Sequence, residues 1–187
     1  MVCYYLVEEK LSISNADSSG LLPVDIGGNV GHDLVNFQAK FPNPPVKLLL
    51  EDLAQVVASA HNFPSGIEAI GHDFFQTQPL TIHNAKGYYI RNVLYDWPDE
   101  QAKNILENVR EVMSILLIDE NALINRNVAM YPATLDMIMM CVIASLNWTD
   151  PQFEELLDSA GFELVATLRS KEYVPGAGTL FKAVLKK

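Results

Sequence analysis

The sequence predicts a doubly wound α/β fold, in which helices cover both faces of a mostly parallel sheet. Short apolar runs alternate with segments of helical period along most of the chain. One of these runs ends in Asp25 and leads into a glycine turn, and the next ends in the acidic pair Glu51-Asp52. The runs that we expect to form strands span residues 21–25, 46–51, 67–71, 86–91, 115–119, 163–169 and 179–185.

Helical periodicity predicts helices after the first of these runs and between the fourth and the fifth. After the glycine turn, Leu34, Phe37 and Phe41 recur at helical spacing, and we expect that helix to end before Pro42. A second helix is predicted over residues 99–114. Its inward apolar stripe consists of Ile105, Leu106, Val109 and Val112.

A last helix precedes the final two strands. Thr149 or Asp150 can cap it, Pro151 suits its first turn, and Gly161 follows its end. The glycine- and proline-rich loop 173–178 then fits a connection between antiparallel neighbours, so the sheet should contain an antiparallel last strand.

Composition narrows the class of protein. The chain has 187 residues, of which 49% are hydrophobic, and a mean hydropathy of +0.11, which suits one domain with a sizeable core. A net charge of −10 without a basic cluster argues against a nucleic-acid or anionic-membrane surface. With two cysteines, Cys3 and Cys141, and no signal-peptide pattern at the start, we expect a cytoplasmic protein without disulfides.

The glycine turn limits which nucleotide could bind. Gly27, Gly28 and Gly31 do not have the spacing that holds a pyrophosphate, and no Gly-Lys-Ser or Gly-Lys-Thr follows, so a dinucleotide or a P-loop is disfavoured. Asp52 follows Gly31 by about twenty residues, the spacing of a carboxylate that binds both ribose hydroxyls. S-adenosylmethionine is the common ligand that remains. A glycine turn that only joins strand to helix is the alternative.

The motifs resemble those of the plant and fungal small-molecule O-methyltransferases, which are class I S-adenosylmethionine-dependent enzymes of secondary metabolism. The matching segments run in order along nearly the whole chain: residues 5–9, VDIGGNVGHDL, KFPN, LLLEDL, GHDFF, YYIRNVLYDWPDE, LDMIMM and ELLDSAGFELV. The resemblance implies a Rossmann-like class I methyltransferase fold with a seven-stranded sheet. It also implies S-adenosylmethionine or S-adenosylhomocysteine as cofactor, and a hydroxylated aromatic or polyketide-like substrate.

The resemblance assigns cofactor contacts to several residues. Gly27, Gly28 and Gly31 would face the methionine moiety, and Asp52 would bind the ribose. Asp73 and Phe74 would contact the adenine, and Arg91 occupies a position where the family places a basic cofactor contact. Asp25 and Leu53 complete the expected cofactor-binding set.

Three departures from the family pattern concern catalysis. Tyr95 stands where the family has the histidine that removes the substrate's proton, directly before Asp-Trp. Asn125 and Asn147 stand where we expect the two acidic residues that steady this histidine. Because a tyrosine has a reference pKa of about 10, Tyr95 should be protonated at neutral pH and donate a hydrogen bond. We expect these three residues to form the catalytic or substrate-binding group.

Three functions stay open at this level. A phenol substrate with a lowered pKa would need little base, so an O-methyltransferase remains possible. Alternatively, the fold could catalyse a non-methylating cyclisation, dehydration or pericyclic step. The third possibility is a non-catalytic subunit of a partner.

We expect one face of this fold to be uncovered. We expect residues 1–187 to form a single methyltransferase-like domain without the family's amino-terminal helical dimerisation domain. A second copy or a partner chain could then cover the open face. We expect no metal site, because no histidine pair has ligand spacing. The methionine-rich segment 130–140 should line a substrate cavity or fill the core.

Overall fold

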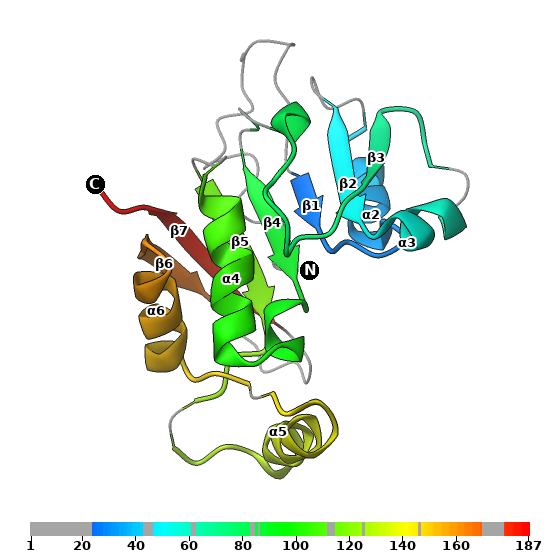
Figure 1. Ribbon diagram of the computed structural model, residues 1–187. Helices are drawn as coiled ribbons and strands as arrows, with labels where there is room; N and C mark the ends of the chain where they lie inside the picture. Colours follow the sequence, from blue (N-terminus) through cyan, green and yellow to red (C-terminus); the bar gives the residue numbers. More distant parts are fainter. Residues whose placement is uncertain are drawn as a thin grey trace.

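The predicted apolar runs form seven strands in one sheet (Figure 1). The computed structural model describes residues 24–42, 47–60, 63–82, 85, 87–111, 115–124, 126–145, 147–169 and 178–187. The strands are β1 (Val24–Ile26), β2 (Leu48–Asp52), β3 (Ile67–Gly71), β4 (Tyr88–Arg91), β5 (Ile115–Glu120), β6 (Phe162–Leu168) and β7 (Thr179–Leu185). The helices are α2 (His32–Lys40), α3 (Ala54–Ser59), α4 (Asp99–Arg110), α5 (Met130–Ile143) and α6 (Asp150–Ser159), with short 3₁₀ turns η2 (Leu80–Ile82) and η3 (Leu94–Asp96).

The sheet has the strand order β3-β2-β1-β4-β5-β7-β6. β1 pairs in parallel with β2 and β4, β2 pairs in parallel with β3, and β4 with β5. β7 lies antiparallel between β5 and β6. The predicted class I methyltransferase fold with an antiparallel last strand is therefore confirmed. The strand order reverses between β1 and β4, which places a ligand crevice at the carboxyl ends of these two strands.

The predicted helix boundaries at the end of α2 and around α6 agree with the structure, whereas several strand ends differ from the prediction by a residue or two. α2 ends at Lys40, and the Phe41 amide donates to the Phe37 carbonyl just before Pro42. α6 begins with a capping box in which the backbone amide of Thr149 donates to Gln152, and Gly161 follows the helix with a φ of +87°. The second predicted helix, over residues 99–114, is too long, because α4 ends at Arg110 and Glu111 lies in a turn. Residues 112–114, 125 and 170–177 lie outside the described residues, so most of the predicted loop 173–178 is not tested.

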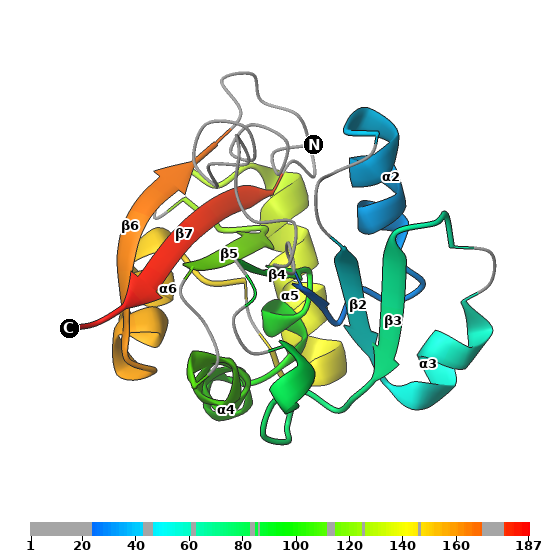
Figure 2. The ribbon, with the colours of Figure 1, turned by 90° about the horizontal axis from the view of Figure 1, so that it is seen from above.

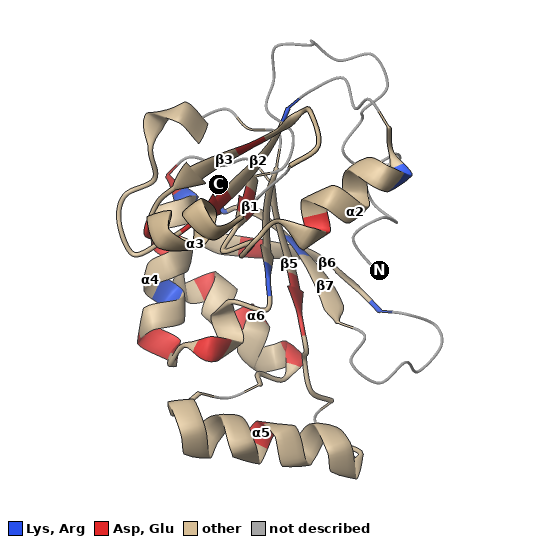
Figure 3. Cartoon of the chain, turned by 90° about the vertical axis from the view of Figure 1, so that its right-hand side faces the viewer, with Lys and Arg blue, Asp and Glu red and all other residues tan. Residues whose placement is uncertain are grey.

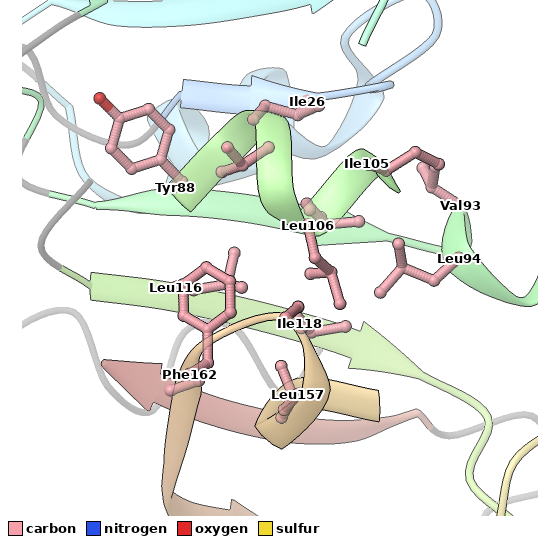
Figure 4. Packing of buried hydrophobic residues seen from close by; sticks show 14 of the residues in the cluster. Ile26, Tyr88, Val93, Leu94, Ile105, Leu106, Leu116, Ile118, Leu157 and Phe162 are labelled. Carbon is pink, nitrogen blue, oxygen red and sulfur yellow. The ribbon is translucent and has the colours of Figure 1, made fainter. Parts of the chain in front are cut away.

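Helices pack on both faces of the sheet, as predicted (Figure 2). On one face, α4 and α6 bury Ile105, Leu106 and Leu157 against Ile118 and Phe162 of the strands (Figure 4). The opposite face carries α2, whose inward side chains pack on β2 and β3. A fully buried strand such as Leu48-Leu49-Leu50 reads as a continuous apolar run because it is covered on both sides.

The methionine-rich helix α5 is not part of the core. No residue of α5 is buried, and Met130 and Met137 are 85% and 62% exposed. The expectation that these methionines fill the core is therefore wrong for this chain. Periodicity alone identifies an apolar helix but does not identify what it packs against.

Candidate functional site

The glycine turn after β1 presses against the end of β2. The amides of Gly27 and Gly28 both donate to the Glu51 carbonyl, at 2.8 and 3.3 Å. Gly27 has a φ of +69°, which favours glycine. A β-carbon on Gly28 would lie 2.5 Å from Asp25 Oδ2 and 2.5 Å from Leu50 Cδ1, so this position has no room for a side chain. The turn is therefore packed closely against Asp25 and the end of β2, and only glycine fits at position 28.

Asp52 ends β2 directly beside this turn. One carboxylate oxygen accepts a hydrogen bond from the Asn29 amide at 2.7 Å, and the other accepts from the Leu53 amide at 2.7 Å. These bonds fix the carboxylate between the glycine turn and the start of α3. Each oxygen retains accepting capacity for a ligand hydroxyl.

Asp73 and Phe74 follow the neighbouring strand β3. The Asp52 carbonyl accepts from the His72 amide at 2.8 Å, which holds the two strand ends together. Asp73 Oδ1 accepts from the Phe75 amide at 3.0 Å. The Phe74 ring reaches the glycine turn, since a β-carbon on Gly27 would lie 3.6 Å from it. The structure thus brings three of the expected cofactor-binding groups to one edge of the sheet.

Arg91 and Asp25 lie at the same edge but make internal contacts. Arg91 Nη1 forms an ion pair with Asp33 at 2.5 Å, and its Nε lies 3.7 Å from Asp119. Asp25 is 1% exposed, and its Oδ2 has no hydrogen-bond partner among the described residues. Burial, with a further contribution from Asp33, raises the pKa of Asp25 to about 8. Asp25 is therefore largely uncharged at neutral pH.

Tyr95 lies in η3, a turn held by a buried carboxylate. Glu120 Oε1, at the end of β5, accepts from the Val93 and Leu94 amides at 3.0 and 2.9 Å. Burial raises the pKa of Glu120 to about 8. Burial, together with Asp96 and Glu120, also raises the pKa of Tyr95 above its usual value. The phenol of Tyr95 is therefore protonated at neutral pH and can donate a hydrogen bond.

Asn147 belongs to a buried segment that contacts the Tyr95 turn. The Ser145 hydroxyl bonds to the Tyr95 carbonyl and lies 3.1 Å from the Trp97 carbonyl. The Asn147 amide donates to Asp136 Oδ1 of α5 at 2.7 Å. The structure therefore places Asn147 two residues from a direct contact with the Tyr95 turn. Asn125 lies outside the described residues.

Glu120 is the residue that the sequence analysis missed. It occupies the end of β5 next to Asp119, just as Asp52 follows Glu51 at the end of β2. An acidic pair directly after a buried apolar run was the available signal. Successive strand residues point to opposite faces, so one member of such a pair turns toward the core.

Metal-binding clusters and membrane-spanning helices are both absent from the described residues. No group of three or more histidine, cysteine or acidic side chains in the described ranges is placed to hold a metal ion. Among the same ranges, no helix is both long and apolar enough to cross a bilayer.

Comparison with known proteins identifies related chains. A family profile described as "O-methyltransferase domain" matches residues 7–163. The demethylsterigmatocystin 6-O-methyltransferase of Aspergillus flavus is 38% identical over 170 residues, which are 89% of this chain and 42% of that protein.

Solved structures give the same result for the fold. The complex of LepI with SAM superposes with a TM-score of 0.88 at 32% identity, and covers 96% of this chain and 46% of that one. A structure described as "A Pericyclic Reaction enzyme" gives a TM-score of 0.88 at 32% identity, over 96% of this chain and 47% of that one. The chain thus spans about half the length of these proteins.

Proposed function

The chain belongs to the O-methyltransferase domain family, and from this premise we propose that it acts as an S-adenosylmethionine-dependent enzyme of fungal secondary metabolism. The proposed substrate is a hydroxylated aromatic or polyketide-like small molecule. The observation that carries the proposal is the carboxylate of Asp52, fixed by the Asn29 amide beside a glycine turn that has no room for side chains.

The residues of the crevice suit the parts of S-adenosylmethionine. Gly27, Gly28 and Gly31 offer backbone to the methionine moiety, and the Asp52 carboxylate accepts from the ribose hydroxyls. Leu53, Asp73 and Phe74 would surround the adenine. Asp25, beneath the turn, and Arg91, at the end of β4, complete the proposed cofactor-binding set. When bound, the cofactor supplies a methyl group activated by a sulfonium.

Tyr95 makes a base-assisted transfer difficult. Its phenol is protonated, so it can orient a substrate oxygen by donating a hydrogen bond but does not accept a proton at neutral pH. Methyl transfer then requires a substrate hydroxyl acidic enough to lose its proton to water. The same neutral group, with Asn147, would suit a second candidate function.

The second candidate is a non-methylating cyclisation, dehydration or pericyclic step. It is favoured by Tyr95 in place of a base and by the similarity to a structure described as "A Pericyclic Reaction enzyme". In this case the hydrogen-bond donors at Tyr95 and Asn147 stabilise charge that develops on the substrate.

The first experiment is a calorimetric titration with S-adenosylhomocysteine. We expect micromolar affinity, about −8 kcal/mol, for the wild type. Asp52→Ala should weaken binding at least tenfold, and Asp158→Ala, a change at an exposed ion pair with Lys186, serves as the matched control. Absence of binding by the folded wild type would overturn the cofactor assignment.

A gain-of-function experiment separates the two candidate reactions. The double variant Tyr95→His with Asn147→Glu restores a base and one acidic partner beside the retained Glu120. If the missing base is the only obstacle to methylation, this variant should methylate a panel of phenols faster than the wild type. A folded variant that binds cofactor without any gain would count against methyl transfer and favour the second candidate.

We also propose that the chain associates with a second copy through α5. Figure 3 shows α5 apart from the layered body of the fold. The one charged residue of α5 is Asp136. Its exposed side chains include Met130, Met137 and Val142, which are 85%, 62% and 74% exposed. A helix that is apolar all round is normally buried. Because the chain carries a net charge of −10, the α5 of a second copy, which carries only this one charge, is its best-matched surface.

Sedimentation velocity over a range of concentrations tests this association. We expect a concentration-dependent dimer for the wild type and a monomer for Met137→Glu. Val165→Glu is the matched control, since Val165 is an equally apolar side chain, 54% exposed, on the edge strand β6. A wild type that stays monomeric at high concentration would refute a second copy and leave a different chain or a non-catalytic subunit role.

A further inference from the structure

Glu51 and Gln78 form a buried polar pair that lies outside the expected cofactor-binding set. Glu51 is 1% exposed and Gln78 is 3% exposed. Gln78 Nε2 donates to Glu51 Oε1 at 3.2 Å, across 27 positions of the chain. The pair therefore links β2 to the segment that follows β3.

Two oxygens of this pair have no hydrogen-bond partner among the described residues. They are Glu51 Oε2 and Gln78 Oε1, and both are buried. An ionised carboxylate only accepts hydrogen bonds, and a primary amide has one acceptor and two donors. With Glu51 ionised, these two oxygens would be buried acceptors without a donor, which is costly in a low-dielectric interior.

We propose that Glu51 is a protonated carboxylic acid that forms a cyclic two-bond pair with Gln78 and positions the nucleoside end of the cofactor crevice. Gln78 Nε2 donates to Glu51 Oε1, and the Oε2 hydroxyl of Glu51 donates to Gln78 Oε1. One proton thus satisfies both unpartnered oxygens. The positioning role rests on the proposed cofactor binding, whereas the protonated pair does not.

The surroundings of Glu51 favour the neutral acid. Burial raises the pKa of Glu51 to about 7; the hydrogen bond from Gln78 opposes the rise, and the neighbouring Asp52 adds to it. The other titratable group that faces Glu51 among the described residues is Tyr88 on β4, whose own pKa burial raises to about 12. Among the described residues, no cation contributes to the pKa of Glu51, so no positive charge stabilises the ionised carboxylate.

The pair sits where it can set the geometry of the crevice. The backbone carbonyl of Glu51 accepts from the glycine turn, and the next residue is Asp52. On the other side, Gln78 lies four positions after Phe74, and the turn between them is closed by the Gln76 amide donating to the Asp73 carbonyl at 2.8 Å. The pair therefore holds the segment that contains Asp73 against the strand that contains Asp52. Ionisation of Glu51 would remove the hydrogen bond from the Glu51 hydroxyl to Gln78 and loosen this contact.

Infrared difference spectroscopy tests the proton directly. The wild-type minus Glu51→Gln spectrum should contain the carbonyl stretch of a protonated carboxylic acid at pH 6, and this signal should disappear by pH 9. Glu68→Gln on the adjacent strand β3 is the matched control, because Glu68 is exposed; its difference spectrum should lack the acid signal. No protonated signal at pH 6 would overturn the proposal.

Cofactor affinity tests the positioning role. Between pH 6 and pH 9, the affinity of the wild type for S-adenosylhomocysteine should fall about tenfold more than that of Glu51→Gln, which keeps a cyclic amide pair with Gln78. Glu68→Gln should follow the wild type. If wild type and Glu51→Gln change in parallel, the positioning role is wrong even where the infrared signal is present.

A second variant covers the case in which Glu51→Gln does not fold. Gln78→Met removes both amide partners, and the acid stretch should then shift toward that of a carboxyl without hydrogen bonds. An unshifted stretch would show that Glu51 holds its proton without Gln78 and would refute the pair. If the wild type binds no cofactor at any pH, the proposed function and the positioning role both fail, while the infrared result still decides the protonated pair.

Discussion

Replacing Glu120 should show how much one buried carboxylate stabilises the turn that contains Tyr95. Glu120 is 2% exposed and accepts hydrogen bonds from the amides of Val93 and Leu94, which are themselves buried. Glu120→Ala leaves both amides without an acceptor. At about 1–3 kcal/mol for each unsatisfied group, and allowing for water entry, the loss should be about 2–4 kcal/mol of unfolding free energy relative to Glu120→Gln, which keeps the acceptor.

The pH dependence separates the charge of Glu120 from its hydrogen bonds. Its pKa is about 8 in the folded state against 4.5 for the free group, so the folded protein retains a proton that the unfolded chain has lost. Stability due to Glu120 is complete below about pH 4.5, falls as the pH rises, and is lost above about pH 8. The difference between wild type and Glu120→Gln should therefore grow across this window, by an upper bound of about 5 kcal/mol.

Urea unfolding at pH 5, 7 and 9 measures both effects. The contribution of carboxylates that do not interact with Glu120 cancels in the difference between variants, whereas Asp96 and Asp119 interact with Glu120 and contribute to this difference. Glu163→Gln, at an exposed position of β6, is the matched control and should follow the wild type. Parallel pH profiles of wild type and Glu120→Gln would refute the neutral buried acid. Equal stability of Glu120→Ala and Glu120→Gln would refute the role of its hydrogen bonds.

Three further changes test the crevice and its supports. Asp52→Asn should weaken S-adenosylhomocysteine binding by about tenfold in calorimetry, since one carboxylate oxygen becomes a donor; unchanged affinity would contradict the ribose assignment. Gly28→Ala should lower the unfolding free energy by about 1–3 kcal/mol, because its β-carbon would meet Asp25 Oδ2 at 2.5 Å. Trp148→Phe removes the 3.0 Å hydrogen bond from Nε1 to Asp99 and should lower the free energy of unfolding in urea by about 1 kcal/mol. An unchanged free energy of unfolding would show that water replaces this bond.

The sheet and the glycine turn could be predicted because local chemistry determines them. Continuous apolar runs mark strands that are buried on both faces, and the segments 67–71 and 179–185 were placed with the observed bounds. Parallel strands bring their carboxyl ends to one edge, so Asp52 and Asp73 could be assigned to one crevice. The cofactor contacts assigned to these residues stay a prediction.

The partners of Glu120 and the packing of α5 could not be predicted, for different physical reasons. An acidic residue at a strand end looks the same in sequence whether it faces water or accepts from a distant turn, and the partners of Glu120 lie 26 and 27 positions away. The apolar period of α5 predicts burial, but not whether the cover comes from its own chain. Both depend on contacts between segments far apart in sequence.

The apolar helix and the Tyr95 turn are joined through one short segment, so association should affect the site. Ser145 follows α5 and bonds to the backbone of the Tyr95 turn, and its side chain is 1% exposed. A contact that shifts the end of α5 would therefore move the backbone of Tyr95 with it. If α5 mediates dimerisation, turnover per chain should rise with protein concentration in the wild type and should not rise in Met137→Glu. Ser145→Ala should uncouple the two, giving dimers whose turnover does not depend on concentration. Turnover that stays constant while the wild type dimerises would refute this coupling.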